Sequence, residues 1–424
     1  MSNLAFVFPG QGSQCVGMGK DLCKETPIAG RMFENANDVL GFDLQKLCFE
    51  GPLDELTKTE NTQPALLTYA YALFDIYMDR VGIAPKLSAG HSLGEYSALV
   101  CCGAMNFQDA LKIVRKRGQF MQEAAALGTG TMAAVSGIEE NIIEEKCKKY
   151  SAEEACVGIA CYNTPEQIVI SGMKEAVEGV TKELAALGAR CVKLNVSAPF
   201  HSLLMQTAAS RLNEELSKHQ YNGFEWPVIS NVTALPYLSK NEIPENLTSQ
   251  MIKPVLWKHS MEYFCRQEID IVIEMGPQAV LKNMMKKFSK NVAAYSYEKR
   301  EEQEAVRNLL SSNQVNKPVK TIKKMDVLTR CMAIAVCTKN NNWDNEEYQK
   351  GVVEPYRKVK ELQERLESEN KEPTLKQMNE VVEMLRSVFI TKKTPIEEQI
   401  ERFNQLFDET GTRELFSDFK IAIN

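Results

Sequence analysis

Two kinds of hydrophobic pattern alternate along most of the chain. Short apolar runs at 4–8, 84–89 and 269–274 are typical of buried strands. Longer segments at 64–81 and 107–126 predict helices, and in the second of them apolar side chains recur at helical spacing. Because such strands and helices follow one another, we expect an α/β domain built on a mostly parallel sheet.

Residues 128–197 show a different order of predicted strands and helices. The pattern predicts a strand, a helix, two strands that flank the turn Asn163-Thr164-Pro165, a second helix and a final strand. This βαββαβ order is that of a ferredoxin-like motif. We therefore expect a ferredoxin-like subdomain inserted between residues 1–127 and 198–315 of the α/β domain. The predicted elements lie at 131–135, 139–150, 155–160, 167–170, 174–187 and 190–196.

The pattern changes again near residue 318. Of the 23 glycines, 21 precede this point, as do all four histidines. Charged segments with one apolar helical face follow, and they predict a helical extension over residues 318–424 after a domain boundary at about 312–322. A packed structural extension and a docking platform for a partner protein are both open. The apolar positions are Val352, Val353, Tyr356, Val359, Leu362, Leu366, Met378, Val381, Val382 and Leu385.

Composition and charge exclude several classes of function. Basic residues number 50 and acidic residues 56, and no lysine or arginine run is interleaved with aromatic side chains, so no nucleic-acid partner is expected. The 12 cysteines show no paired spacing and the four histidines no metal-binding spacing, so we expect reduced thiols and no metal site. The first apolar run has no basic leader, and no stretch approaches about 18 apolar residues. A cytoplasmic protein without a membrane span is therefore expected.

The sequence Gly90-His91-Ser92-Leu93-Gly94 stands between an apolar run and a predicted helix. It has the G-x-S-x-G form of a nucleophile elbow, in which a strand turns sharply into a helix and two glycines make room for the turn. Ser92 is therefore the candidate nucleophile. The predicted fold becomes an α/β-hydrolase-like core with the ferredoxin-like insertion and the helical extension. A capping serine at an ordinary turn is the alternative.

Two further side chains are candidates for chemistry. His201 opens a predicted helix, where the positive end of the helix dipole favours a neutral imidazole that can accept a proton from a serine. A partly buried structural histidine is the alternative.

Arg117 lies four residues from both Ile113 and Met121, so it falls on the apolar face of its helix, with Arg115 turned to solvent. A buried guanidinium needs a partner, either a substrate carboxylate or the acid of a structural ion pair.

The loop Pro9-Gly10-Gln11-Gly12-Ser13-Gln14 follows the first predicted strand. It has neither the lysine of a phosphate-binding loop nor the spacing of a dinucleotide fingerprint. A tight turn whose backbone N–H groups face an oxyanion is the functional interpretation, and a plain turn the structural one. No acidic residue between Ser92 and His201 stands out as a third triad member, so another kind of group is expected to orient the histidine.

Eight motifs follow one another over about residues 3–300. They lie at 8–14, 90–96, 117–122, 163–167, 197–202 and 231–234, at Gln250 with 254–257, and at 274–277. Together they resemble the motifs of the malonyl-CoA:acyl carrier protein transacylase family. Such an ordered set is far more specific than a single elbow.

The resemblance implies a role for each candidate in the reaction. Ser92 would attack a thioester, and His201 would act as base and then as acid. The backbone N–H groups of Gln11 and Leu93 would hold the oxyanion. A main-chain carbonyl of Gln250 would steady the histidine, which explains the missing acid.

The resemblance also implies the substrates. A malonyl group would pass from malonyl-CoA through an ester of Ser92 to the phosphopantetheine thiol of an acyl carrier protein, in fatty acid or polyketide synthesis, with no resident cofactor. Arg117 would pair with the malonyl carboxylate, and Phe200 would disfavour a branched methylmalonyl group. An acyl hydrolase, or a trans-acting acyltransferase that serves a polyketide synthase, is the alternative. Minimal family members end near residue 315, so the extension departs from the family and, as a platform, would dock a synthase component.

Overall fold

The computed structural model describes residues 3–312 and 327–419, apart from 127, 129, 152–155, 195, 197, 370, 372, 411, 414, 417 and 418. The chain divides into two compact units, Met1–Val315 and Asn316–Asn424. Most of the boundary region expected at about 312–322 lies outside the described residues. The domain limits drawn from the sequence therefore stay predictions.

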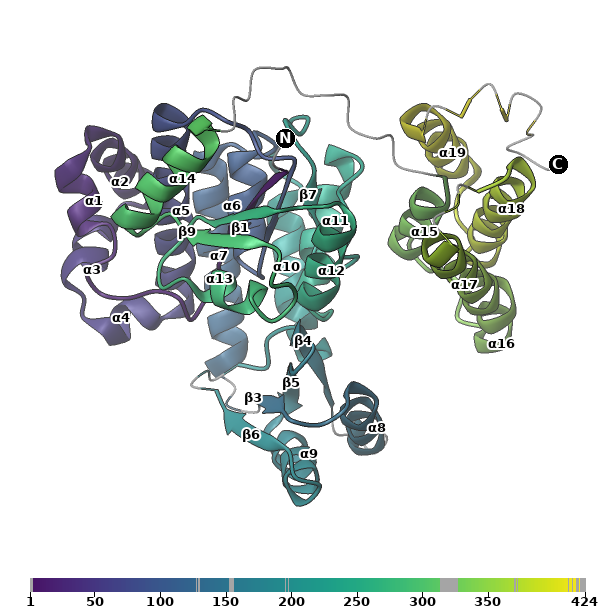
Figure 1. Ribbon diagram of the computed structural model, residues 1–424. Coiled ribbons are helices and arrows are strands. Elements are labelled where there is room, and N and C mark those ends of the chain that lie inside the picture. The colour runs from purple at the N-terminus through teal and green to yellow at the C-terminus, as the bar shows by residue number, and fades with distance from the viewer. Residues whose placement is uncertain are drawn as a thin grey trace. The chain divides into compact units, whose positions relative to one another are not determined.

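A five-stranded sheet forms the centre of the first unit (Figure 1). Its strands are β1 (Leu4–Phe8), β2 (Leu87–Gly90), β7 (Val228–Ile229), β8 (Ile271–Glu274) and β9 (Ala293–Ser296). The order is β7-β2-β1-β8-β9, and every neighbouring pair is parallel. Strand β1 is buried at every position, as expected for a parallel strand covered on both faces. The predicted α/β core with a mostly parallel sheet is confirmed.

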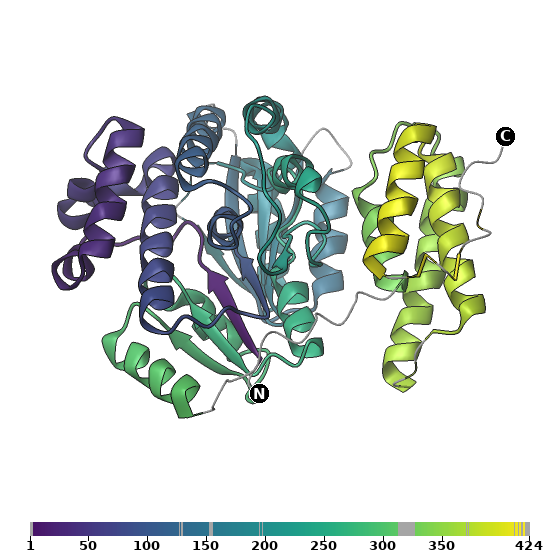
Figure 2. The same ribbon diagram turned by 90° about the horizontal axis from the view of Figure 1, so that it is seen from above.

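Helices cover both faces of this sheet (Figures 1 and 2). Phe74 and Tyr77 pack edge-on against Phe6 of β1, with ring centroids 6.1 and 4.9 Å apart. Both aromatic residues belong to the long helix α5, which is thereby fixed to the centre of the sheet. The helices are α1 (Lys20–Glu25), α2 (Pro27–Leu40), α3 (Leu44–Glu50), α4 (Leu53–Thr57), α5 (Thr59–Arg80), α6 (Gly94–Cys101), α7 (Phe107–Ala126), α10 (Gln206–Leu216), α11 (Ile243–Gln250), α12 (Trp257–Arg266), α13 (Val280–Met285) and α14 (Arg300–Ser312), with 3₁₀ turns at Leu203–Met205 and Lys240–Glu242.

Helix α5 begins at Thr59, before the start predicted at Pro64. A proline inside a helix has no N–H for the carbonyl four residues earlier, which here belongs to Glu60. That carbonyl accepts instead from Arg115 Nη1 at 2.8 Å, and Arg115 Nη2 pairs with the Glu60 carboxylate at 3.2 Å. The expectation that Arg115 turns to solvent is therefore wrong, because this side chain serves the carbonyl that the proline leaves free.

The inserted subdomain has the predicted βαββαβ order. Its elements are β3 (Gly130–Ser136), α8 (Glu140–Ser151), β4 (Val157–Thr164), β5 (Gln167–Met173), α9 (Lys174–Ala186) and β6 (Arg190–Lys193). Antiparallel pairing gives the order β4-β5-β3-β6, which is that of a ferredoxin-like sheet. Asn163 and Thr164 belong to β4 rather than to a turn, because Thr164 pairs with Gln167 and only Pro165 and Glu166 make the connection. The strand start predicted at residue 155 lies outside the described residues.

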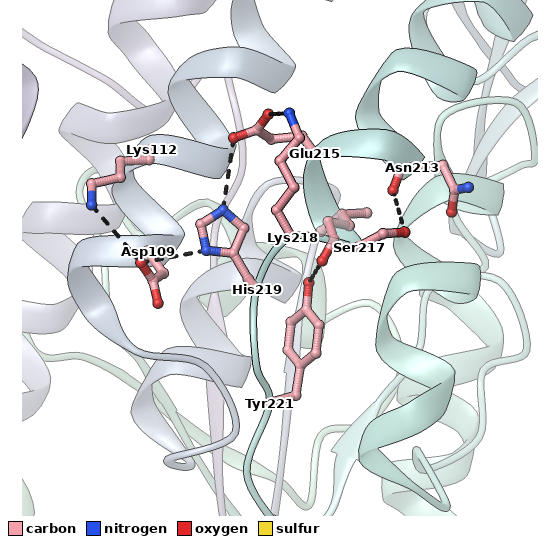
Figure 3. Close-up of polar contacts among 9 residues, drawn as sticks. Asp109, Lys112, Asn213, Glu215, Ser217, Lys218, His219 and Tyr221 are labelled. Carbon is pink, nitrogen blue, oxygen red and sulfur yellow. Dashed lines mark hydrogen bonds and ion pairs between the residues drawn. The ribbon is translucent and has the colours of Figure 1, made fainter.

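A polar cluster fastens α7, which carries Arg117, to α10, which follows His201 (Figure 3). His219 lies between the two helices, with Nδ1 3.4 Å from the Asp109 carboxylate of α7 and Nε2 3.7 Å from the Glu215 carboxylate of α10. The contacts join the start of α7 to the end of α10. They therefore help to fix α7, which carries Arg117, against the helix that follows the segment of His201.

The second unit is a group of helices with a core of its own. Its elements are α15 (Val327–Cys337), α16 (Asn345–Tyr348), a π-helical turn (Gln349–Val353), α17 (Glu354–Glu369), α18 (Leu375–Thr391) and α19 (Ile396–Thr410). Phe389 and Phe403 are buried there and pack edge-on, with centroids 5.3 Å apart. Val352 and Val359 are buried as predicted, whereas Val353 is exposed, because the π-helical turn shifts the phase of the apolar face. Among the described residues, no helix is both long and apolar enough to cross a membrane.

Candidate active site

Ser92 lies on a tight turn between β2 and α6. Its φ is 50°, in the left-handed region that residues with a side chain avoid, so the turn is strained. A Cβ at Gly90 would lie 1.9 Å from the backbone of Gly94, and a Cβ at Gly94 would lie 1.9 Å from the carbonyl oxygen of Phe8. Only glycine fits at both positions. This geometry is that of a nucleophile elbow.

His201 lies beside Ser92. Ser92 Oγ and His201 Nε2 are 2.9 Å apart, and His201 Nδ1 donates to the main-chain carbonyl of Gln250 at 2.7 Å. Because a carbonyl can only accept, it fixes the proton on Nδ1 and leaves the lone pair of Nε2 facing the serine hydroxyl. The structure thus brings together the candidate nucleophile, the candidate base and the candidate orienting group, with a carbonyl where a triad has a carboxylate.

The neutral state of His201 has a different cause from the one predicted. Burial, followed by the charge of Arg117, lowers the pKa of His201 to about 3. The helix dipole is not the reason, because His201 precedes the helical segment: the 3₁₀ turn begins at Leu203 and α10 at Gln206. The prediction of a neutral ring agrees with this environment, but the argument from the dipole is wrong.

Arg117 is almost completely buried, at 1% exposure. Its Nη2 donates to Ser92 Oγ at 3.2 Å and to Gln250 Oε1 at 3.0 Å, and its guanidinium lies over the Tyr96 ring, 5.3 Å from the centroid. Within the described part of the chain, no carboxylate lies within 4.0 Å of it, and its buried Nε has no hydrogen-bond partner. The alternative of a structural ion pair is therefore wrong, and the guanidinium retains a donor for a ligand.

One candidate oxyanion donor, Leu93, belongs to the elbow, and the other, Gln11, lies on the loop that follows β1. The backbone N–H groups of Gln11 and Leu93 have no acceptor among the described residues. A Cβ at Gly10 would lie 2.4 Å from the carbonyl oxygen of His91, so the loop of Gln11 approaches the elbow backbone to backbone. The N–H of Ser92 is already used, because it donates to Asn231 Oδ1 at 2.7 Å. Leu93, rather than Ser92, is thus the elbow residue with an N–H available to an oxyanion.

Sequence reasoning missed the polar residues that support the elbow from behind. Asn231 donates to the Gly90 carbonyl at 2.6 Å and accepts from Ser92 N–H, so it clamps both sides of the turn. Glu95 is fully buried on α6 and accepts from the Tyr237 hydroxyl at 2.6 Å. A glutamate beside an otherwise apolar helical stretch was a visible signal, but its partners are distant in sequence.

The arrangement can carry out acyl transfer. It offers a hydroxyl with a neutral imidazole at hydrogen-bond distance, two N–H groups that have no acceptor among the described residues, and a buried cation beside the same hydroxyl. Where side chains are described, no group of three or more histidine, cysteine, aspartate or glutamate residues is placed to hold a metal ion. The set suits attack on a carbonyl carbon in a substrate that also carries an anionic group.

Residues 5–329 match the family model described as acyl transferase domain. The malonyl CoA-acyl carrier protein transacylase of Bacillus subtilis is 40% identical over 401 residues, which cover 94% of this chain and 99% of that protein. The transacylase of the same name from Escherichia coli K12 is 44% identical over 295 residues, or 69% of this chain and 95% of that protein. At 94% coverage, the Bacillus alignment includes most of the second unit. The expectation that the resemblance ends near residue 315 is therefore wrong for that relative.

Two solved structures share the fold. The malonyl CoA-acyl carrier protein transacylase from Coxiella burnetii is 38% identical, with a TM-score of 0.71, and covers 73% of this chain and 98% of its own. A complex described as a type II PKS acyl-carrier protein with its malonyl-transacylase is 39% identical, with a TM-score of 0.71, and covers 73% of this chain and 100% of that one. Sequence relatives and solved structures agree, and the chain belongs to the malonyl-CoA:acyl carrier protein transacylase family.

Proposed function

We propose that this chain transfers a malonyl group from malonyl-CoA to the phosphopantetheine thiol of an acyl carrier protein, through a malonyl ester of Ser92. One observation carries the proposal: Ser92 Oγ lies 2.9 Å from His201 Nε2 and 3.2 Å from Arg117 Nη2. A nucleophile with a base on one side and a buried cation on the other suits an acyl donor that ends in a carboxylate. The family assignment supports the same activity.

The first half-reaction loads the serine. His201 Nε2 takes the hydroxyl proton while Ser92 Oγ bonds to the thioester carbon of malonyl-CoA. The negative charge that develops on the carbonyl oxygen is held by the N–H groups of Gln11 and Leu93. The C–S bond then breaks, and the departing CoA sulfur receives the proton from His201. The products are free CoA and the malonyl ester of Ser92.

The second half-reaction removes the malonyl group from Ser92. The pantetheine thiol of the carrier protein gives its proton to His201 Nε2, and its sulfur bonds to the ester carbon. The C–O bond breaks and Ser92 Oγ recovers the proton, so no oxidant or reductant is required. Both substrates carry a long pantetheine arm, and a covalent intermediate lets them use one site in turn. The cytoplasmic location expected from the sequence remains part of this proposal.

Arg117 is proposed to select the substrate in two ways. It pairs with the malonyl carboxylate, and a group without that carboxylate leaves the buried guanidinium unpaired. Its charge also contributes, after burial, to the low pKa of His201. A carboxylate bound to Arg117 offsets this charge and raises the pKa of the base. The base therefore becomes stronger when the correct acyl group is bound.

The alternative of an acyl hydrolase is less well supported. A hydrolase that removes uncharged acyl chains has no use for a buried cation at its nucleophile. Arg117 lies within hydrogen-bond distance of Ser92 Oγ, where the acyl group would sit. We therefore retain malonyl transfer, and leave the choice between fatty acid and polyketide synthesis to the identity of the acceptor.

We also propose that the second unit docks a synthase component, with the acyl carrier protein as the first to test. Trp343 is 91% exposed and Ile390 is 60% exposed. They lie at one end of the unit, where Lys392 Nζ donates to the Ala335 carbonyl at 2.8 Å and the Asn341 N–H donates to the Lys392 carbonyl. Large exposed apolar side chains are typical of protein-binding surfaces. Replacement of Trp343 by serine should weaken binding of holo acyl carrier protein about tenfold; unchanged binding would contradict the proposal.

Malonyl transfer is tested by mass spectrometry of the full chain incubated with malonyl-CoA. We expect one malonyl group on Ser92, located by peptide mapping, and its removal on addition of holo acyl carrier protein. Ser92→Ala should carry no adduct, whereas Ser97→Ala, a change of a buried serine on the helix that follows the elbow, should carry the wild-type amount. Absence of any adduct on the wild-type protein would contradict the proposed function.

A further inference from the structure

Glu95 is a fully buried carboxylate that the proposed reaction does not use. Its Oε1 accepts from the Tyr237 hydroxyl at 2.6 Å, and its Oε2 accepts from Gln250 Nε2 at 2.6 Å and from the Asn231 N–H at 3.2 Å. No lysine, arginine or histidine nitrogen in the described part of the chain lies within 4.0 Å of it. Burying a carboxylate without an ion-pair partner is costly, so its hydrogen-bond partners indicate what it does.

Gln250 lies between Glu95 and the groups that act on the substrate. Its Oε1 accepts from Arg117 Nη2 at 3.0 Å, while its Nε2 donates to Glu95 and to the Ser92 carbonyl, the latter at 2.9 Å. Its main-chain carbonyl accepts from His201 Nδ1. Arginine can only donate and a carboxylate can only accept, so one orientation of the amide satisfies both neighbours.

We infer that Glu95 is a positioning residue, which holds the Gln250 amide with its oxygen toward Arg117 and so holds the guanidinium beside Ser92. The inference rests on the proposed malonyl transfer. A direct ion pair between Glu95 and Arg117 would occupy the guanidinium. The interposed neutral amide fixes the place of Arg117 and leaves its Nε, buried and unpartnered among the described residues, for the substrate.

Glu274 provides a matched control. It is fully buried like Glu95, and burial raises the pKa of each to about 7. Its oxygens, however, accept from the backbone N–H groups of Leu281 and Lys282 at 3.1 and 2.8 Å, in the first turn of α13. Glu274 therefore caps a helix, and within the described part of the chain it makes no hydrogen bond to Gln250 or Arg117.

The test compares Glu95→Gln with Glu274→Gln in the full chain. Acylation of Ser92 by malonyl-CoA and by acetyl-CoA is followed by mass spectrometry, and kcat/KM is obtained for each donor. For Glu95→Gln we expect the malonyl-to-acetyl ratio to fall about tenfold, mainly through a higher KM for malonyl-CoA, because Arg117 loses its fixed partner. Glu274→Gln should keep the wild-type ratio, whatever its effect on stability.

The wild-type protein gives a second readout. Because its pKa is about 7, Glu95 takes up a proton as the pH falls through this value, and the malonyl-to-acetyl ratio should fall with it. The other groups that face it keep their charge state: burial raises the pKa of Tyr237 and Tyr96, lowers that of His201 to about 3, and Arg117 remains a guanidinium. In Glu95→Gln the ratio should not vary with pH.

Each outcome has one meaning. A wild-type ratio in Glu95→Gln at every pH would overturn the inference and leave Glu95 a purely structural residue. A wild-type protein that forms no malonyl ester would overturn the proposed function instead. If Glu95→Gln does not fold, the inference is tested by the pH dependence of the malonyl-to-acetyl ratio in the wild-type protein. A ratio that stays constant between about pH 5.5 and about pH 8.5 would overturn the inference.

Discussion

The two units of this chain depart from ordinary protein structure in different places. In the first unit several departures gather at the active site: Ser92 and His201 both have positive φ, at 50° and 57°, and the buried Arg117 has no carboxylate within 4.0 Å among the described residues. In the second unit a conspicuous departure is on the surface, where Trp343 is 91% exposed. Strain and a buried charge at one site are typical of a place of chemistry, and a large exposed apolar side chain suits the docking proposed for the second unit.

This comparison predicts that the largest effect of any single change comes from the elbow. Ser92→Ala removes the atom to which the acyl group bonds, so transfer to the carrier protein should fall about 10⁴-fold or more. The measurement is steady-state transfer from malonyl-CoA. A variant that kept a tenth of the activity would show that the reaction does not pass through this serine.

Arg117→Ala should have the next largest effect. Loss of the buried partner of the substrate carboxylate should lower kcat/KM for malonyl-CoA about 10²-fold to 10³-fold, and should change that for acetyl-CoA far less. Arg115→Ala is the matched control on the same helix, because Arg115 pairs with Glu60 away from Ser92. Equal losses for both donors would mean that Arg117 supports the fold and does not bind the carboxylate.

The pH profile should reveal the buried base. The pKa of His201 is lowered to about 3, so the imidazole stays neutral and active as the pH falls through its ordinary value of about 6.5. Acylation by acetyl-CoA, which brings no carboxylate to Arg117, should therefore be constant between about pH 5 and about pH 8. An acidic limb centred near pH 6.5 would show that His201 is more exposed to water than the structure indicates.

The lowered pKa of His201 also determines how the free energy of unfolding should change with pH. His201 contributes stability that is present above its unfolded pKa of about 6.5 and is lost as the pH falls toward about 3, because the unfolded chain binds the proton more tightly. Denaturant unfolding of the wild type beside His201→Gln, at pH values within this window, measures the difference.

The smallest effect is expected from the second unit. Trp343→Ser should leave acylation of Ser92 within about twofold of wild type, since no step of the proposed reaction uses this side chain. The measurement is the rate of malonyl ester formation without carrier protein. A large loss of this rate would show that the second unit takes part in acylation and does not serve docking alone.

Local chemistry made part of the site predictable. The G-x-S-x-G sequence predicts a turn that only glycine permits on both sides of Ser92, and the positions of Gly90 and Gly94 in the structure show why. The burial of Arg117 followed from its spacing to Ile113 and Met121 on one helix. Each of these predictions needed only neighbours within one or two turns of the chain.

The features of the site and fold that depend on residues distant in sequence could not be predicted. Asn231 and Glu95 hold the elbow through bonds that span more than a hundred residues, and their types fit many other roles. The low pKa of His201 comes from burial, which no local pattern gives, so the dipole argument supplied the wrong cause. The start of α5 before Pro64 likewise depended on Arg115, which reaches it from another helix.

The most direct test of the central claim is the identity of the acyl group on Ser92 when the full chain is mixed with equal amounts of malonyl-CoA and acetyl-CoA. We expect the intact mass after one turnover to be that of the malonyl ester, in about 10²-fold excess over the acetyl ester, and we expect Arg117→Ala to remove most of this excess. A wild-type protein that acquires acetyl as readily as malonyl would contradict the claim that Arg117 selects the substrate carboxylate at this serine.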